Sequence, residues 1–293
     1  MEEILIAKGM SIAIPAYRNA PRLRRCLSSL GRFNPELLRV TTVVDDSGDG
    51  CVAKELVQEF SEVRWIVNKE NLGFASSANA AVLACENDWV LLLNDDVELV
   101  ESIGTELVRQ LGDESLFALS LQSINENGQF REGAKRLVWR MGIARILHNP
   151  ADQSETINGF TPSAYAVGGH AMFRRKVFEE LGGFDLSFDP FYWEDVDLCA
   201  RAARDGYHTK CYEMAHVLHR NDGAIKSAND RDRIRYYTWL NRLRFSALHA
   251  KEIQRIMLPF GIAWQALHAK ATSDYAKWNA VKTFLRLSGR QRH

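Results

Sequence analysis

Short runs of apolar residues, each ending in polar residues, alternate along the chain with segments of helical periodicity. The clearest run is Trp89 to Leu93, which is followed directly by Asn94, Asp95 and Asp96. A continuous apolar run of this length is typical of a strand buried on both faces of a parallel sheet. Further strands are predicted at residues 10–15, 40–44, 63–67, 115–121, 166–173 and 208–214, and helices at 19–30, 52–60, 75–85, 176–181 and 191–202. This alternation predicts an α/β fold with a mostly parallel, Rossmann-like sheet flanked by helices.

The polar residues after the strand at 89–93 are the first candidates for chemistry. Asn94, Asp95 and Asp96 should emerge at the carboxyl end of that strand, where open α/β sheets bind ligands. Adjacent carboxylates repel one another unless a positive group lies between them. A hard divalent cation, held by carboxylate oxygens, water and a substrate diphosphate, would meet that need. For this motif by itself, a solvated loop after a core strand is the alternative.

Three other stretches carry weaker signals. Residues 125–160 are rich in Gly, Asn and Arg and have no firm period, so we expect a long excursion that includes a hairpin or lid. Gly168 and Gly169 interrupt a predicted strand, which indicates a close approach to the backbone. The first turn of the helix at 191–202 carries three carboxylates, an arrangement that the helix dipole alone would favour. Beyond residue 230 the pattern of apolar residues predicts helices.

Composition places the chain among ordinary globular proteins, with 293 residues, 46% hydrophobic and 25% charged. The net charge of zero hides an asymmetry. From residue 230 to the end there are 13 Lys and Arg against 4 Asp and Glu, which gives +9 and leaves −9 for residues 1–229. The basic tail is expected either to contact an anionic membrane surface or to form a helical appendage that packs on the core or makes a homodimer. No nucleic-acid partner is expected.

Cysteine spacing and the N-terminus bear on the compartment. The five cysteines are scattered without paired spacing, so we expect buried free thiols rather than a zinc site or disulfides. Residues 1–4 lack the basic start and apolar core of a signal peptide, and no apolar stretch approaches the roughly 20 residues that span a bilayer. We therefore expect a cytoplasmic protein, peripheral on the inner face of the membrane if the tail binds lipid.

The order of the motifs resembles that of the family 2 glycosyltransferases of the GT-A fold, in particular the bacterial branch with rhamnosyltransferase-like enzymes. The resemblance rests on the joint order and spacing of the motifs over roughly residues 10–225. The matching segments are Ile14 to Asn19, Val43 to Ser47, Asn68 to Asn79, Leu92 to Asp96, Gly182 to Asp185, Tyr192 to Asp197 and Val217 to His219. It implies a nucleotide-sugar transferase domain over residues 1–229 and a basic helical extension over 230–293.

The resemblance also implies a nucleotide pocket at the ends of the first strands. Its residues would be Pro15, Ala16, Tyr17, Asp45, Asn71, Gly73 and Asp95. Asp45 would accept a hydrogen bond from the base, and the imide N–H of uracil or thymine would donate it. UDP and dTDP donors both fit, and the rhamnosyl resemblance favours dTDP-rhamnose.

The resemblance assigns roles around the reacting bond as well. Asp96 and His219 would hold Mg²⁺ or Mn²⁺ against the diphosphate, with His216 structural. Asp195 would be the general base that takes the proton of the acceptor hydroxyl, so that a single displacement inverts the anomeric configuration. The donor sugar and acceptor would lie in a pocket formed by Gly169, His170, Trp193 and Glu194. The acceptor would be a glycan or a polyprenyl-linked saccharide in the synthesis of a cell-surface polysaccharide.

Two other classes of protein remain as alternatives. A sugar nucleotidyltransferase would use a similar sheet, but it needs a glycine-rich basic loop after the first strand, and Pro15 to Arg18 is not such a loop. A non-catalytic glycan-binding or scaffolding protein could keep the fold without the chemistry. The intact Asp96, Asp195 and His219 argue against this second alternative.

Overall fold

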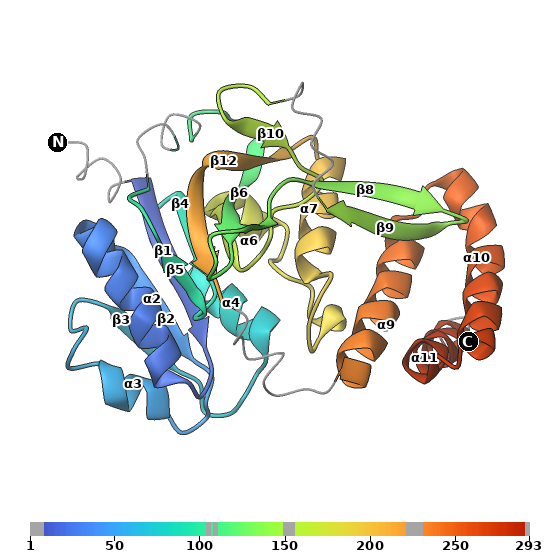
Figure 1. Ribbon diagram of the computed structural model, residues 1–293, viewed down its shortest axis with the longest axis horizontal. Coiled ribbons are helices and arrows are strands. Elements are labelled where there is room, and N and C mark those ends of the chain that lie inside the picture. The colour runs from blue at the N-terminus through green and yellow to red at the C-terminus, as the bar shows by residue number, and fades with distance from the viewer. Residues whose placement is uncertain (1–8, 104–106, 108–110, 149–155, 221–230, 291–293) are drawn as a thin grey trace.

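The protein is built on one large mixed β-sheet whose main path is mostly parallel (Figure 1). The computed structural model describes residues 9–103, 107, 111–148, 156–220 and 231–290. The main path runs in the order β10-β12-β6-β11-β4-β1-β2-β3, with β5 and β7 at its sides. The strands are β1 (Met10–Ala16), β2 (Thr41–Asp45), β3 (Arg64–Val67), β4 (Trp89–Leu93), β5 (Val97–Leu99), β6 (Leu116–Ile124), β7 (Phe130–Glu132), β10 (Phe160–Pro162), β11 (His170–Arg174) and β12 (His208–His219).

The central strands are buried on both faces, as their continuous apolar runs predict. In β4, Leu91 and Leu93 belong to one hydrophobic core, and Val90 and Leu92 belong to the core on the opposite face. β1 pairs in parallel with β4 on one side and with β2 on the other. The carboxyl ends of these three strands therefore meet at one edge of the sheet, and the polar residues that follow them are brought together.

Helices cover both faces of the sheet. On one face lie α2 (Ala20–Phe33) and α3 (Cys51–Leu56); on the other lie α4 (Phe74–Leu83), α6 (Arg175–Glu180) and α7 (Glu194–Arg204). Short 3₁₀ helices cover Pro35–Val40 and Leu186–Phe188. α2 begins where predicted, because the Asn19 side chain accepts a hydrogen bond from the Arg22 N–H at 3.0 Å and caps the helix.

Two elements are shorter than predicted. The helix expected over 52–60 ends at Leu56 and continues as turns. The strand expected over 166–173 begins only at His170, because the backbone turns before it and the His170 N–H donates to Val167 O at 3.0 Å.

β12 is longer than predicted. The strand expected over 208–214 extends to His219, since beyond an irregularity after Tyr212 it pairs again with β6 and also with β5. β5 lies directly after the acidic end of β4 in sequence, and its Val97 is opposite His219. His219 and Asp96 are far apart in the chain, and strand pairing brings them next to each other.

The excursion at 125–160 contains the expected hairpin. β8 (Lys135–Arg140) and β9 (Ile143–His148) form a separate two-stranded antiparallel sheet. Before it, β7 pairs with the end of β6. Residues 149–155 of the excursion lie outside the described residues.

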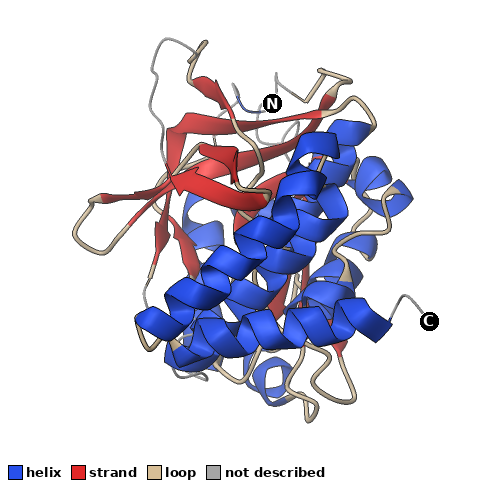
Figure 2. Ribbon diagram, turned by 90° about the vertical axis from the view of Figure 1, so that its right-hand side faces the viewer, coloured by secondary structure: helices blue, strands red, loops and turns tan. Residues whose placement is uncertain are grey.

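Three helices follow the sheet: α9 (Arg231–His249), α10 (Glu252–Ala271) and α11 (Tyr275–Arg290). Figure 2 shows them in front of the sheet when the molecule is viewed from their side. α9 is part of the main core, since the fully buried Phe245 packs against Trp193 and Trp139. The expected boundary between residues 229 and 230 lies outside the described residues. Among the described helices, none combines the length and apolar character that crossing a bilayer requires.

The cysteines follow the sequence-based expectation with one exception. All five are free thiols, and Cys26, Cys85, Cys199 and Cys211 are buried. The prediction of buried thiols is wrong for Cys51, which is exposed at the first position of α3.

Truncating Phe245 tests whether α9 belongs to the core. We expect Phe245→Ala to lower the free energy of unfolding by about 3–5 kcal/mol, because it removes a fully buried ring between two indoles and leaves a cavity. Urea unfolding would measure the change. The control is Leu248→Ala on the same helix, whose side chain is mostly exposed and whose loss should change stability by no more than about 0.5 kcal/mol. Equal effects of the two variants would contradict the packing described.

Candidate active site

A cavity of about 960 Å³ lies at the carboxyl ends of β1, β2 and β4. One side is formed by the residues that follow these strands, and the opposite side by the start of α7, the hairpin strand β9 and the first half of α9. Of the residues predicted from the sequence, all but Asp45 and His170 line it. The lining members of that set are Pro15, Ala16, Tyr17, Asn71, Gly73, Asp95, Asp96, Gly169, Trp193, Glu194, Asp195 and His219.

Asp45 does not reach the cavity, so the expectation that it accepts a hydrogen bond from the nucleobase is corrected. As the last residue of β2 it is fully buried, and its carboxylate accepts hydrogen bonds from Ser47 N at 3.0 Å and Ala53 N at 2.8 Å. The next residue, Asp46, points to the other side and lines the cavity. Its oxygens accept from Leu72 N at 2.9 Å and Gly73 N at 3.0 Å. Asp46 therefore holds the loop that closes this end of the cavity.

Asp95 is buried against a buried arginine. Its Oδ2 lies 2.7 Å from an Nη of Arg22, and the Tyr17 N–H donates to the same oxygen at 3.4 Å. Burial raises the pKa of Asp95 to about 6, although Arg22 acts in the opposite direction. The ion pair keeps this carboxylate directed along the cavity wall beside Tyr17.

Asp96 and His219 form a second buried pair. Asp96 Oδ2 lies 3.4 Å from His219 Nε2, and both side chains are nearly inaccessible. Burial would raise the pKa of Asp96, but His219 and Arg22 outweigh it and hold that pKa below its usual value. The structure thus brings together the two residues that the sequence predicts as metal ligands.

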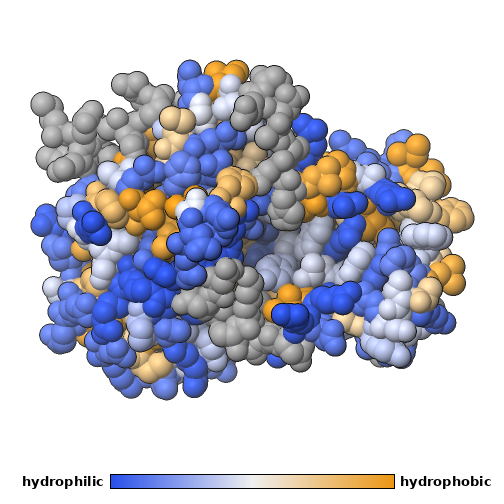
Figure 3. Space-filling model, viewed as in Figure 1, coloured by the Kyte–Doolittle hydropathy of each residue, from blue (hydrophilic) through white to orange (hydrophobic). Residues whose placement is uncertain are grey.

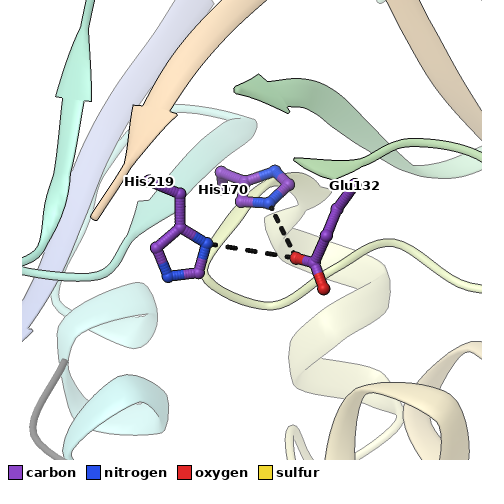
Figure 4. A group of neighbouring side chains, drawn as sticks. All are labelled: Glu132, His170 and His219. Carbon is purple, nitrogen blue, oxygen red and sulfur yellow. Dashed lines mark ion pairs between the residues drawn. The ribbon is translucent and has the colours of Figure 1, made fainter. Parts of the chain in front are cut away.

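Glu132 and His170 extend this pair into a cluster (Figure 4). Glu132 Oε2 lies 3.5 Å from His170 Nε2 and 4.0 Å from His219 Nδ1. One ligand atom of each of Glu132, His170 and His219 lies within 4.8 Å of the other two, which is a suitable spacing for a metal ion. His170 is completely buried on β11 and does not line the cavity, so its predicted role in the sugar pocket is corrected.

The polar atoms of this cluster are incompletely satisfied. Asp96 Oδ1, both ring nitrogens of His170 and His219 Nδ1 are buried and form no hydrogen bond with any described residue. Buried polar atoms are nearly always paired, so several orphaned donors and acceptors in one place fit a bound cation. The residues present therefore suit the divalent ion that the sequence predicts.

Asp195 lies at the start of α7, facing the cavity. Its Oδ2 accepts from Gly168 N at 3.2 Å and its Oδ1 from Val196 N at 2.8 Å. Burial raises the pKa of Asp195 to about 6. Burial, together with the charge of Asp195, raises the pKa of the neighbouring Glu194 by more than the pKa of Asp195 is raised. At neutral pH the site therefore holds one carboxylate suited to accept a proton beside a carboxyl group that favours its neutral form.

The turn before Asp195 is held by α9. Tyr192 and Trp193 both have positive φ, at 72° and 79°, a conformation that bulky residues rarely adopt. The buried Asn241 side chain donates to the backbone carbonyls of Phe191 at 3.0 Å and Tyr192 at 3.1 Å. A strained turn persists only where its surroundings determine it, and here Asn241 does so. Sequence reasoning missed Asn241, because a lone Asn within a helix carries no recognisable signal.

The glycine pair has a packing reason. A Cβ on Gly169 would lie 2.6 Å from Asn94 Nδ2 and 3.0 Å from Asn94 Cγ, so the Asn94 side chain would have to move to admit a larger residue. The approach of a ligand to this backbone stays a prediction.

Comparison with known proteins identifies the class. The family described as Glycosyl transferase family 2 matches residues 11–182, more than half of the chain. The chain therefore belongs to this family and is a glycosyltransferase. Neither alternative, a sugar nucleotidyltransferase or a non-catalytic binding protein, is supported by this membership.

Two relatives come from Mycobacterium tuberculosis strain H37Rv. One is an N-acetylglucosaminyl-diphospho-decaprenol L-rhamnosyltransferase, 26% identical over 233 residues, which cover 72% of this chain and 75% of the relative. The other is a pre-mycofactocin glycosyltransferase, 26% identical over 216 residues, which cover 72% of this chain and 43% of the relative. The chain spans less than half of this second relative.

Solved structures share the GT-A-like fold. GalNAc-T7, solved with UDP, GalNAc and Mn²⁺, matches with a TM-score of 0.63 and 16% identity over 81% of this chain and 47% of its own. TarS residues 1–349 of S. aureus, solved with UDP-GlcNAc, matches with a TM-score of 0.60 and 14% identity over 95% and 81% of the two chains. The mannosyltransferase PcManGT of Pyrobaculum calidifontis, solved with GDP-Man and Mn²⁺, matches with a TM-score of 0.54 and 17% identity over 96% and 75%.

The Arg22–Asp95 pair can be tested by removing one partner. Arg22→Met should lower the free energy of unfolding by about 3–5 kcal/mol near neutral pH, because it leaves a buried carboxylate uncompensated. The double variant Arg22→Met/Asp95→Asn should recover most of this loss. Because burial raises the folded-state pKa of Asp95 above its unfolded value, the penalty grows as the carboxyl ionises and shrinks as pH falls. Urea unfolding at about pH 5 and about pH 8 would measure this, and a pH-independent loss would contradict it.

Proposed function

We propose that this glycosyltransferase is an inverting, divalent-metal-dependent enzyme that transfers a sugar from a UDP or dTDP donor to a glycan or lipid-linked acceptor. The observation that carries the proposal is the presence in one cavity of Asp195, the half-buried candidate for the general base, and of the pair Asp96 and His219. The rhamnosyltransferase relative, whose name includes a diphospho-decaprenol acceptor, favours dTDP-rhamnose and a polyprenyl-linked acceptor.

The nucleotide would bind along the ends of β1 and β2. Pro15, Ala16 and Tyr17 supply one wall and the loop at Asn71 and Gly73 the other. Asp46 takes over the role first expected of Asp45, because its carboxylate faces the cavity and can accept a further hydrogen bond from a uracil or thymine imide. Asp95, held by Arg22, lies on the path toward the ribose and diphosphate.

The charge that develops on the leaving diphosphate needs stabilisation. A divalent ion held at Asp96 and His219 would supply it as a Lewis acid. Three solved enzymes of similar fold contain nucleotides or nucleotide sugars, and two of these also contain Mn²⁺, which agrees with this proposal. Mg²⁺ remains an alternative ion for the same residues.

Asp195 would accept the proton of the attacking hydroxyl. Its carboxylate is half-buried and oriented by two backbone N–H groups, and its pKa is raised, which are the properties of a general base near neutral pH. Direct attack by that hydroxyl on the anomeric carbon, on the side opposite the leaving diphosphate, inverts the configuration. Glu194 and Trp193 line the cavity beside it and would contact the sugar or the acceptor.

Asp195→Asn tests the proposed base. The variant should lose transfer by about a hundredfold or more, because the amide cannot accept the proton, while donor binding stays within about threefold. Transfer would be followed by nucleotide release, and binding by calorimetry with UDP, dTDP, GDP and CDP, each with Mn²⁺ and with EDTA. The control is Asp205→Asn, an exposed carboxylate at the end of the same helix.

The wild-type pH profile provides a second readout. A base with a pKa of about 6 must be deprotonated to act, so kcat/KM should fall about tenfold per pH unit below that value and level off above it. The Asp195→Asn variant should lose this dependence. Retained transfer in that variant, or the absence of metal-dependent binding of any nucleotide, would overturn the proposed function.

An exposed apolar face on the C-terminal helix α10 supports the proposal of a lipid-linked acceptor. Along α10, large apolar side chains at helical spacing are each more than half exposed; they are Ile253, Ile256, Phe260, Trp264 and Leu267. Figure 3 shows apolar residues gathered at this end of the molecule. Monomeric soluble proteins rarely expose so continuous an apolar stripe without a partner.

The charges around this stripe favour an anionic bilayer as the partner. The exposed basic residues of α10 and α11 and the residue before α10 are Lys251, Arg255, Lys270, Lys282 and Arg286. Glu252 is the one exposed acidic residue in this described stretch. A helix with an apolar face and basic flanks lies in the interface of an anionic membrane. β9 packs against α10 and also lines the cavity, which would bring the bilayer close to the acceptor side.

Vesicle co-sedimentation tests this surface. We expect salt-sensitive binding to vesicles of anionic phospholipid and not to zwitterionic ones, and Phe260→Ser/Trp264→Ser should weaken it about tenfold by removing apolar contact area. The matched control is Leu83→Ser/Met214→Ser, two exposed apolar residues outside the C-terminal helices. If the α10 variant instead converts a dimer into a monomer and vesicle binding is unchanged, the face is a homodimer interface and the lipid proposal is wrong.

A further inference from the structure

His170 is a residue for which the proposed transfer chemistry has no use. It is completely buried at the start of β11, and neither ring nitrogen makes a hydrogen bond with a described residue. A buried imidazole whose only close polar neighbour is a carboxylate beyond ordinary hydrogen-bond distance is costly, so its position is suited to a ligand. Its Nε2 faces Glu132, and both face His219, as Figure 4 shows.

We propose that Glu132, His170 and His219 bind a transition-metal ion through Oε2, Nε2 and Nδ1, before any nucleotide is present, and in preference to Mg²⁺. The inference rests on the proposed metal-dependent function and revises its ligand set: His219 is kept as a ligand, and Glu132 and His170 are added. Asp96 acts through His219 instead of binding the ion directly. The three ligand atoms lie within 4.8 Å of one another, and an ion between them would contact two imidazoles and one carboxylate. Imidazole donors suit Zn²⁺, Fe²⁺ and Ni²⁺, and Mn²⁺ is the weakest-binding member of the same divalent transition-metal series; Mg²⁺ prefers oxygen ligands and retains several waters.

The orientation of His219 supports this assignment. Its two ring nitrogens face different carboxylates: Nε2 lies 3.4 Å from Asp96, and Nδ1 lies 4.0 Å from Glu132. When Nε2 carries the proton and donates toward Asp96, Nδ1 presents its lone pair to the side of Glu132 and His170. Carboxylates that orient a ligating histidine in this way are common around metal ions. Asp96 is then a positioning residue for this ion.

Glu132 is likewise oriented by its surroundings. The Lys135 ammonium lies 3.9 Å from Oε1, and Oε2 is the oxygen that faces the two histidines. The fold brings the three ligands from three strands, since Glu132 ends β7, His170 begins β11 and His219 ends β12. A site built on paired strands exists without the nucleotide, which is why the ion should bind to the empty enzyme.

The test is metal binding to the chelator-treated full chain without nucleotide. Mn²⁺ titration followed by electron paramagnetic resonance should show one tight site, and Mn²⁺ or Zn²⁺ should raise the Tm while Mg²⁺ at the same concentration leaves it unchanged. His170→Leu and Glu132→Gln should each weaken Mn²⁺ binding more than about a hundredfold, and Asp96→Asn by about 10- to 100-fold. The control is His216→Leu, a partly exposed histidine on the same strand that contacts Glu101.

The outcomes separate this inference from the proposed function. If Mn²⁺ binds only together with UDP or dTDP, or binds equally to wild type and His170→Leu, the proposed ligand set is wrong even where Asp195 proves essential for transfer. If Mn²⁺ binds without nucleotide through His170 but Asp195→Asn retains transfer, the ligand set stands and the proposed base is wrong. The Tm values of the metal-free variants show whether a lost signal reflects the site or the fold.

Discussion

The concentration of buried carboxylates in one cavity is the constraint on which the rest of the site depends. Asp95 and Asp96 are adjacent and nearly inaccessible at the end of β4. Such a pair is tolerated only with nearby positive charge or a bound cation. The fold supplies the charge of Arg22 to Asp95, and Asp96 lies beside the His219 imidazole. Asp95 is thereby tied to the protein, and Asp96 lies next to the proposed metal site.

The opposite wall of the cavity depends on the C-terminal helices. Asn241 on α9 holds the carbonyls of a turn in which Tyr192 and Trp193 have positive φ, and Asp195 follows that turn directly. His249 on the same helix lies 2.7 Å from Asp197 in the first turn of α7. α9 therefore helps to hold the wall of the cavity that carries Asp195. α10, one helix further on, carries its apolar residues outward to solvent.

These two features connect the proposals to one another. The cluster of Glu132, His170 and His219 lies on β7, β11 and β12, which all pair with β6, and the exposed stripe of α10 lies beyond the hairpin. In the proposed enzyme the donor diphosphate would lie against the metal cluster. A membrane-bound acceptor would approach from the side of the C-terminal helices. Asp195, the proposed base, lies at the start of α7.

The sequence by itself determined the alternation of strands and helices and the acidic end of β4. These follow from local periodicity and from polar residues placed directly after apolar runs, which parallel pairing brings to one edge. The candidate base Asp195 and the residues expected in the nucleotide pocket came instead from the resemblance of the sequence motifs to a family. Only the tertiary structure decided which of Asp45 and Asp46 faces the cavity, because the end of β2 and the turn that follows it determine where each carboxylate lies. It also decided that Glu132 and Asn241 belong to the site, and that His170, which the sequence placed in the sugar pocket, lies buried beside Glu132. Their neighbours in space are distant in sequence, and strand pairing and helix packing, which local patterns do not encode, bring them together.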